Sequence, residues 1–236
     1  MSAGARGATP ARSYAMGHLR LHSNVSYGLI AGRPVFLDVS RDRYLALDPL
    51  AEAAFDRARQ PPSSACPNNE DATRLLATKL FTLADDWTPM PPVQVQIPDI
   101  QISPEAPARS RLLDVPEIWL LLWQARRALV SGALGSALCR LKNHRSKVLA
   151  PASSVETAAL ACRFQMARAL VPIAPSCLQD SLALGTWLAR RGACPDIVFG
   201  VKLDPFAAHC WVQTEAAILN DAPDTVSPFA PVLVIS

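Results

Sequence analysis

A proline-rich stretch near the middle of the chain constrains the fold more than any other sequence feature. Between residues 86 and 110 there are six prolines, at positions 89, 91, 92, 98, 104 and 107. Proline lacks a backbone N–H and fixes φ, so this stretch excludes a helix interior and favours an extended linker. Within it, residues 93–97 alternate apolar and polar side chains, a pattern that would allow part of the linker to dock as an edge strand. We therefore expect two folding units, one on each side of the linker.

Length and charge limit the class of protein. The chain has 236 residues, half of them hydrophobic, which is enough for two small domains with buried cores. No apolar run reaches the roughly 18 to 20 residues that span a bilayer, and the N-terminus lacks the apolar core of a secretory signal. We expect a cytoplasmic protein with no membrane insertion. A net charge of only +3, spread over the chain, disfavours nucleic acid as a partner.

The cysteines do not form a recognisable metal or disulfide pattern. All six are scattered without a C-x-x-C pair, which fits neither a zinc site nor a small disulfide-rich scaffold. The sequence also lacks a P-loop. We expect no cofactor and no metal, and most of the cysteines should be buried thiols.

The N-terminal half alternates short strands with helices. Residues 14–47 hold short apolar runs broken by turn residues, a pattern typical of a small antiparallel meander. Asp48 and Pro49 provide a cap and a first-turn proline for a helix ending near Ala58. Leucines at helical spacing predict a second helix over 69–84. Together these elements predict a small α+β unit.

The C-terminal half begins with helices and ends with strands. Helices are predicted over 114–134, 154–170 and 177–191, the last followed by Gly192 where a left-handed residue is needed. The basic segment 140–147 is expected to be a solvated loop. The apolar period then changes to two, which predicts strands over 196–203, 209–215 and 218–221. A helix packed on an antiparallel sheet is the expected arrangement.

Cys177 stands at the start of the third of these helices. Pro172 and Pro175 keep the preceding residues out of a helix interior, so Cys177 falls in or beside the first turn. Unsatisfied N–H groups and the positive end of the helix dipole favour a thiolate there. The same N–H groups point where an oxyanion would form during attack on an amide carbonyl. The alternative is that Cys177 is an ordinary buried thiol.

A base and an orienting acid follow Cys177 in the sequence. His209 opens a predicted strand, where an imidazole could hold the thiolate and later protonate a leaving amine. Asp221 ends the next predicted strand and would accept a hydrogen bond from that imidazole. The alternatives are a surface histidine and an aspartate that starts a turn before Pro223. A cysteine on a helix with His and Asp on a sheet is the arrangement of papain-like and transglutaminase-like enzymes.

The segment 177–221 resembles the core of the lasso-peptide leader peptidases, the B proteins of lasso-peptide biosynthesis. The resemblance rests on C-L-x-x-S-L-A-L, R-R-G, D-P-F-A-A-H-x-W-V and L-N-D, in the order and approximate spacing of the family. It implies a transglutaminase-like cysteine peptidase in which Cys177, His209 and Asp221 carry proteolysis. It also implies a lasso precursor peptide as substrate and an asparagine-synthetase-like cyclase as partner.

The family suggests an identity for the N-terminal half as well. Many lasso B proteins carry a RiPP precursor recognition element, a winged-helix-like unit of three strands and three helices that binds the leader. The resemblance therefore implies an α+β chain with four parts: a flexible tail (1–14), a leader-recognition domain (15–86), the proline-rich linker (87–110) and the peptidase domain (111–236). Such elements bind the leader by strand addition. Here we expect the strand edge within 33–40 and the helix at 69–84 to bind it, through Val35, Phe36, Leu37, Asp38, Leu76, Lys79 and Leu80.

The expected function is removal of the leader from a ribosomally made precursor before macrolactam closure by a separate ATP-dependent cyclase. Two alternatives remain open. An acyl-enzyme on Cys177 could be intercepted by an amine, as in transglutaminases. A protein without catalysis could instead act as a chaperone that presents the precursor to a partner enzyme.

Overall fold

The computed structural model describes residues 17–61, 69–102 and 113–236, and it divides into two compact units. One unit includes the chain up to His22 and resumes over Pro49–Met90. The other holds Ser23–Asp48 and Pro91–Ser236. The predicted tail (1–14) lies outside the described residues. Strands and helices are mixed in both units, so the chain has the α+β class expected from its sequence.

The described residues of the first unit form two strands and two helices. β1 (His18–Leu21) pairs antiparallel with β5 (Phe81–Ala84), while α1 (Pro49–Ala58) and α2 (Asn69–Ala77) contact each other. The ring of Phe55 lies 5.5 Å from that of Phe81, and both side chains are buried. Helix α1 confirms the prediction, with its proline at the first helical position.

The predicted helix over 69–84 is wrong in its second half. α2 ends at Ala77, where the hydroxyl of Thr78 donates to the carbonyl of Leu75 and Lys79 adopts a φ of 61°. A left-handed residue ends a helix, and the strand β5 follows directly. Helical leucine spacing continued through the break, but pairing with β1 gives the backbone of 81–84 its hydrogen bonds instead.

A three-stranded meander forms part of the second unit. β2 (Val25–Ile30), β3 (Arg33–Asp38) and β4 (Arg43–Ala46) pair antiparallel in the order β2-β3-β4. The predicted meander is confirmed for these strands, but β1 is not part of it. β2 packs against the C-terminal strand so closely that a Cβ on Gly28 would lie 2.0 Å from the carbonyl oxygen of Pro231. Residues 23–48 thus group with the C-terminal segment, a division that differs from the boundaries 15–86 and 111–236 expected from sequence.

The C-terminal sheet has the order β7-β6-β8, with β6 (Asp196–Leu203) in the centre. β7 (Phe206–Gln213) follows a turn at Asp204 and Pro205 and begins earlier than the predicted strand over 209–215. The expected strand over 218–221 is wrong: Ile218 forms single bridges only, and a short helix, α7 (Pro223–Val226), follows. The third strand is instead β8 (Ala230–Ile235), which the sequence analysis did not identify.

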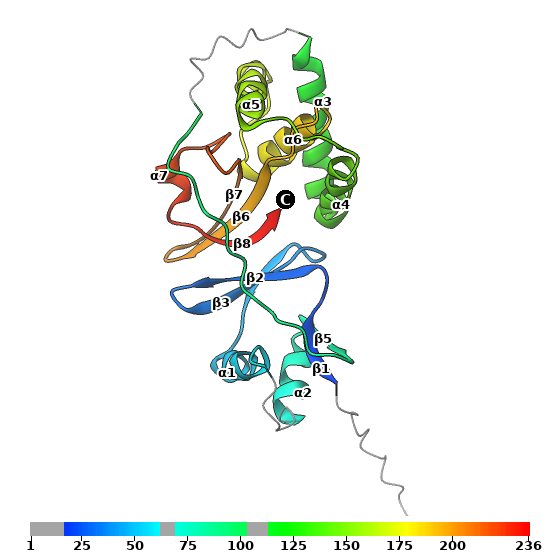
Figure 1. Ribbon diagram of the computed structural model, residues 1–236, viewed down its shortest axis with the longest axis vertical. Coiled ribbons are helices and arrows are strands. Elements are labelled where there is room, and N and C mark those ends of the chain that lie inside the picture. Colours follow the sequence, from blue (N-terminus) through cyan, green and yellow to red (C-terminus); the bar gives the residue numbers. More distant parts are fainter. Residues whose placement is uncertain (1–16, 62–68, 103–112) are drawn as a thin grey trace, which may run out of the picture. The chain divides into compact units, whose positions relative to one another are not determined.

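Four helices accompany this sheet: α3 (Asp114–Val130), α4 (Leu134–Arg145), α5 (Ser154–Arg168) and α6 (Cys177–Ala189). α6 runs between the other three and the sheet (Figure 1). Nine of its residues are buried. Ser153 caps α5, in a capping box with Glu156. The expected basic loop at 140–147 is wrong, because Gly132, with a φ of 67°, ends α3 early and α4 begins directly after it.

The linker docks on the second unit without forming a regular strand. The N–H of Val93 donates to Tyr27, the side chain of Gln213 donates to the carbonyl of Gln96, and residues 100–102 exchange hydrogen bonds with Ile218. The expected docking of 93–97 is therefore seen as loop contacts rather than as an edge strand. No helix in the described part of the chain is long and apolar enough to cross a membrane.

Candidate active site

The three predicted catalytic residues come together from separate elements of the second unit. Cys177 is the first residue of α6 and is exposed. His209 lies in the middle of β7, and Asp221 lies in the loop that follows the Ile218 bridge. The side chains of His209 and Asp221 are mostly buried, with 14% and 20% of their surface exposed. Cys177 is therefore the most exposed residue of the three.

The environment of Cys177 favours the thiolate. A hydrogen bond with the His209 side chain lowers the pKa of this thiol, burial opposes that effect, and the backbone N–H groups of Cys210 and Leu178 lower the pKa further. The two buried thiols behave in the opposite way, because burial raises the pKa of both Cys162 and Cys210. The lowered pKa of Cys177 is what the sequence leads us to expect of a candidate nucleophile in the first helical turn.

His209 is held by the carboxylate of Asp221. Its Nε2 lies 2.6 Å from Oδ2 of Asp221, which leaves Nδ1 for the thiol. The hydrogen bond to Asp221 and the one to Cys177 raise the pKa of His209 to about 9. An imidazolium beside a thiolate is the resting pair of a cysteine nucleophile and its acid.

Asp221 is the residue that orients the imidazole. Burial acts to raise its pKa, but hydrogen bonds from His209 and from the N–H of Ala222 outweigh burial and lower the pKa overall. The Ala222 N–H donates to the second carboxylate oxygen at 2.8 Å. Asp221 therefore stays ionised and acts only as an acceptor.

Two aromatic rings fix the imidazole from the side. The ring of Trp211 lies 6.1 Å from that of His209 and nearly parallel to it, and the ring of Phe229 lies 5.1 Å away. Gly200, which pairs with His209 in the sheet, leaves room for both, since a Cβ there would lie 2.7 Å from the Trp211 ring. This packing restricts the rotation of His209.

Asn220 and Ser181 fasten the Asp221 loop to the nucleophile helix, and sequence reasoning assigned neither a role. The side chain of Asn220 accepts from the N–H of Val212 at 2.7 Å and donates to the hydroxyl of Ser181 at 2.9 Å. Ser181 in turn donates to the carbonyl of Cys210. The only sequence signal was that both residues belong to the family-like elements C-L-x-x-S and L-N-D.

Arg168 positions the segment before Cys177 and was also missed. Its guanidinium donates to the carbonyls of Val171 and Ile173 and to the carboxylate of Asp180 at 2.8 Å. Asp180 accepts from the N–H of Ser176, next to the nucleophile. One arginine thus joins α5, the loop and the first turn of α6. An isolated arginine at the end of a helix gave no signal of this role.

Tyr44 of the meander lies near the thiol. Burial raises the pKa of its phenol, and negative charge on Cys210, Asp42 and Cys177 raises it further. Its ring meets that of Phe206 edge to face at 6.0 Å. Residues 23–48 therefore place Tyr44 near the candidate site, where its ring contacts Phe206 of β7.

The predicted leader-binding residues fall into two groups. Val35, Phe36, Leu37 and Asp38 are buried in β3, whereas Leu76, Lys79 and Leu80 belong to the other compact unit. β3 pairs with β2 on one side and β4 on the other, so the strand edge expected within 33–40 is already occupied. The edge strand of this sheet beyond β3 is β4.

Comparison with known proteins assigns a domain type to the second half of the chain. Residues 119–234 match the model of the transglutaminase-like superfamily, a segment that contains Cys177, His209 and Asp221. No curated protein and no solved structure gave a significant match. The chain thus has an N-terminal sheet region and a C-terminal transglutaminase-like domain, whose chemistry is compatible with cysteine protease or acyltransferase activity.

Proposed function

We propose that this protein is a cysteine endopeptidase that removes the leader from a lasso precursor peptide. The observation that carries the proposal is the line of contacts from the Cys177 thiol through the His209 ring to the Asp221 carboxylate. The resemblance of 177–221 to lasso leader peptidases supplies the substrate class.

The reaction follows from the charges of the resting pair. The Cys177 thiolate attacks the carbonyl carbon at the leader–core junction, and the resulting oxyanion is stabilised by N–H groups of the first turn of α6. His209 gives its proton to the departing amine, which leaves as the N-terminus of the core peptide. The neutral imidazole then takes a proton from water, whose oxygen attacks the thioester and releases the leader with a free carboxylate.

Recognition of the leader would hold the scissile bond at the thiol. We place strand addition at the edge of β4 rather than at β3, because β3 has partners on both sides. Tyr44 belongs to β4 and lies close enough to feel the charge of Cys177, so a segment paired there would approach the nucleophile. This placement replaces the leader contacts expected within 33–40. The contacts expected of Leu76, Lys79 and Leu80 stay a separate prediction for the other unit. The protein would act in the cytoplasm, together with an asparagine-synthetase-like cyclase that forms the macrolactam ring of the released core peptide.

The test is incubation of the full-length protein with a lasso precursor peptide, followed by mass spectrometry. We expect two products whose masses sum to that of the precursor plus one water. Cys177→Ala should abolish them, whereas Cys139→Ala, which removes another exposed thiol, should leave the rate unchanged. Cleavage by Cys177→Ala would overturn the proposal.

The same experiment separates the alternatives. A new amide to an added amine in place of the hydrolysed product would indicate acyl transfer. Binding of the precursor without any covalent change would indicate a presenting chaperone. A substrate-free check is alkylation by iodoacetamide, which should modify Cys177 faster than Cys139 or Cys194, because the His209 imidazole lowers the pKa of Cys177.

A further inference from the structure

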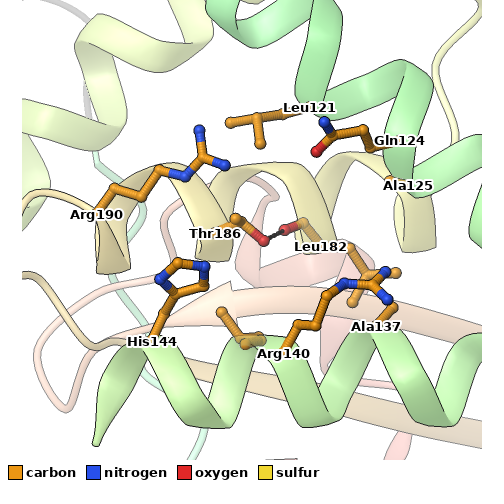
Figure 2. Close-up of a pocket in the computed structure, with 10 residues that line it drawn as sticks. Leu121, Gln124, Ala125, Ala137, Arg140, His144, Leu182, Thr186 and Arg190 are labelled. Atoms are coloured by element: carbon orange, nitrogen blue, oxygen red, sulfur yellow. Dashed lines mark hydrogen bonds between the residues drawn. The ribbon is translucent and has the colours of Figure 1, made fainter. Parts of the chain in front are cut away.

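A small pocket lies along α6, between α3 and α4. Its lining comes from all three helices, and Figure 2 shows α6 passing between Gln124 of α3 on one side and Arg140 and His144 of α4 on the other. Arg190, just past the last residue of α6, completes the rim. None of the three predicted catalytic residues lines this pocket.

The charged side chains that line the pocket are all basic. Two guanidinium groups and an imidazole meet there with the amide of Gln124, and no carboxylate is among the ten lining residues. Arg140 forms no ion pair with any residue that the structure describes. Arg190 has one contact with Glu117 at 3.3 Å, but that carboxylate is held more closely by Arg191, at 2.6 Å. The cationic groups of the pocket therefore lack a full counter-charge.

The shape of the pocket limits the ligand. Its volume is about 110 Å³, well below the roughly 300 Å³ at which pockets for drug-sized molecules begin. Thr186 contributes little as a donor, because its hydroxyl already donates to the carbonyl of Leu182 at 2.7 Å (Figure 2). The remaining donors are the two guanidinium groups, the Gln124 amide and the imidazole, a set suited to an oxyanion with several acceptor atoms.

We infer that this pocket binds a single phosphate group, held by Arg140 and Arg190 with Gln124 and His144 as additional donors. Guanidinium groups match the oxygen geometry of phosphate and remain charged at any physiological pH, so two of them give both charge and direction to the site. The phosphate group enters either as free orthophosphate or as the end of a small organic phosphate whose remainder stays in solvent. The inference is independent of the reaction at Cys177.

The experiment is a titration of the full-length protein with orthophosphate at constant ionic strength, followed by NMR of backbone amides and arginine side chains. We expect saturable shifts at Arg140, Thr186 and Arg190. Arg140→Gln and Arg190→Gln should each weaken binding by roughly tenfold or more, since each removes a charge-assisted contact. Arg126→Gln, an exposed arginine of α3 outside this pocket, is the matched control and should leave the affinity unchanged.

Methyl phosphate, titrated in parallel, distinguishes the two sources of the ligand. Equal binding of both compounds indicates that an organic phosphate can present its terminal group, and preference for orthophosphate indicates the free ion. Shifts that fail to saturate, that chloride reproduces, or that survive in both pocket variants would overturn the inference. Circular dichroism of each variant confirms that a loss of binding is not a loss of fold.

Discussion

Nε2 of His209 lies 2.6 Å from Oδ2 of Asp221, although the chain between the end of β7 and Asp221 forms only isolated β-bridges at Ile218 instead of a strand. Two hydrogen bonds on the loop, from Val212 to the Asn220 side chain and from Ala222 to Asp221, hold the carboxylate in place. These hydrogen bonds, rather than strand pairing in the sheet, therefore fix the position of the Asp221 carboxylate. The contact between Asp221 and His209 is the main cause of the raised pKa of His209.

Replacing Asp221 with Asn should disable the imidazole while preserving the shape of the site. Asp221 is the first cause of the raised pKa of His209, so the pKa of His209 should fall from about 9. We expect peptide cleavage to drop by on the order of 10²-fold or more, and its alkaline limit to move to lower pH. The rate of cleavage against pH measures both. An unchanged alkaline limit would show that Asp221 does not control His209.

The same shift predicts how stability depends on pH. A base whose pKa is higher in the folded chain than its ordinary 6.5 contributes stability that is fully present below pH 6.5 and is lost as the pH rises towards the folded value, here about 9. In a Cys177→Ala background, the contact with Asp221 alone should preserve this direction. We expect the free energy of unfolding, measured in urea, to fall over this interval relative to a Cys177→Ala, His209→Gln protein. A difference that is constant across pH would contradict the prediction.

Arg168→Met should make the segment before Cys177 less rigid. It removes hydrogen bonds to Val171, Ile173 and Asp180 at a side chain that is only 14% exposed. We expect a loss of about 2 kcal/mol in stability and slower alkylation of Cys177, because the first turn of α6 is no longer fixed.

Arg57→Met is the matched control for Arg168. Arg57 also forms a two-point contact with a carboxylate, that of Asp71, but the arginine side chain is 61% exposed. Its loss should destabilise the protein much less than the loss of Arg168, because solvent screens an exposed ion pair, and should leave alkylation unchanged. Equal effects of the two substitutions would indicate that the Arg168 contacts have no special role.

The elements that carry Cys177 and His209 could be predicted from sequence because local signals mark them. Pro172 and Pro175 exclude a helix before Cys177, and the change to a period of two marks the strand that carries His209. The structure places α6 where these signals predict it, and β7 contains the predicted start at His209 but begins three residues earlier, at Phe206. Local sequence signals were sufficient to predict an element where prolines or a change of hydrophobic period mark its boundaries.

Errors arose where distant pairing decides the structure. The leucine spacing through 76–83 indicates a helix, but β1 recruits 81–84 as a strand. Residues 218–221 look like a strand, yet β8 takes the place beside β6. Arg168 and Asn220 were missed for the same reason, since their partners lie on other elements. Such contacts depend on tertiary packing, which overrides local propensity.

Gly200→Ala should displace the His209 ring indirectly, through the aromatic rings that pack on it. The new Cβ would lie 2.7 Å from the Trp211 ring and 2.9 Å from Cβ of Phe229, and both rings pack on His209. We expect a loss of about 1 to 3 kcal/mol in stability and a slower reaction of Cys177. Gly135→Ala on α4 is the control: its Cβ would meet nothing closer than 3.8 Å, so stability should change by less than about 1 kcal/mol.

Gly28→Ala tests whether the meander is part of the catalytic unit. A Cβ at Gly28 would lie 2.0 Å from the carbonyl oxygen of Pro231, a backbone atom that can move only if β2 separates from β8. We expect a loss of about 3 kcal/mol or more, together with slower alkylation of Cys177, because Tyr44 on the same sheet lies beside the thiol. Ala46→Ser, at an exposed position of β4, should leave both unchanged. If Gly28→Ala left the alkylation rate and the stability at the wild-type values, residues 23–48 would not pack on the peptidase sheet, and the domain boundary expected from sequence near residue 86 would be the better description.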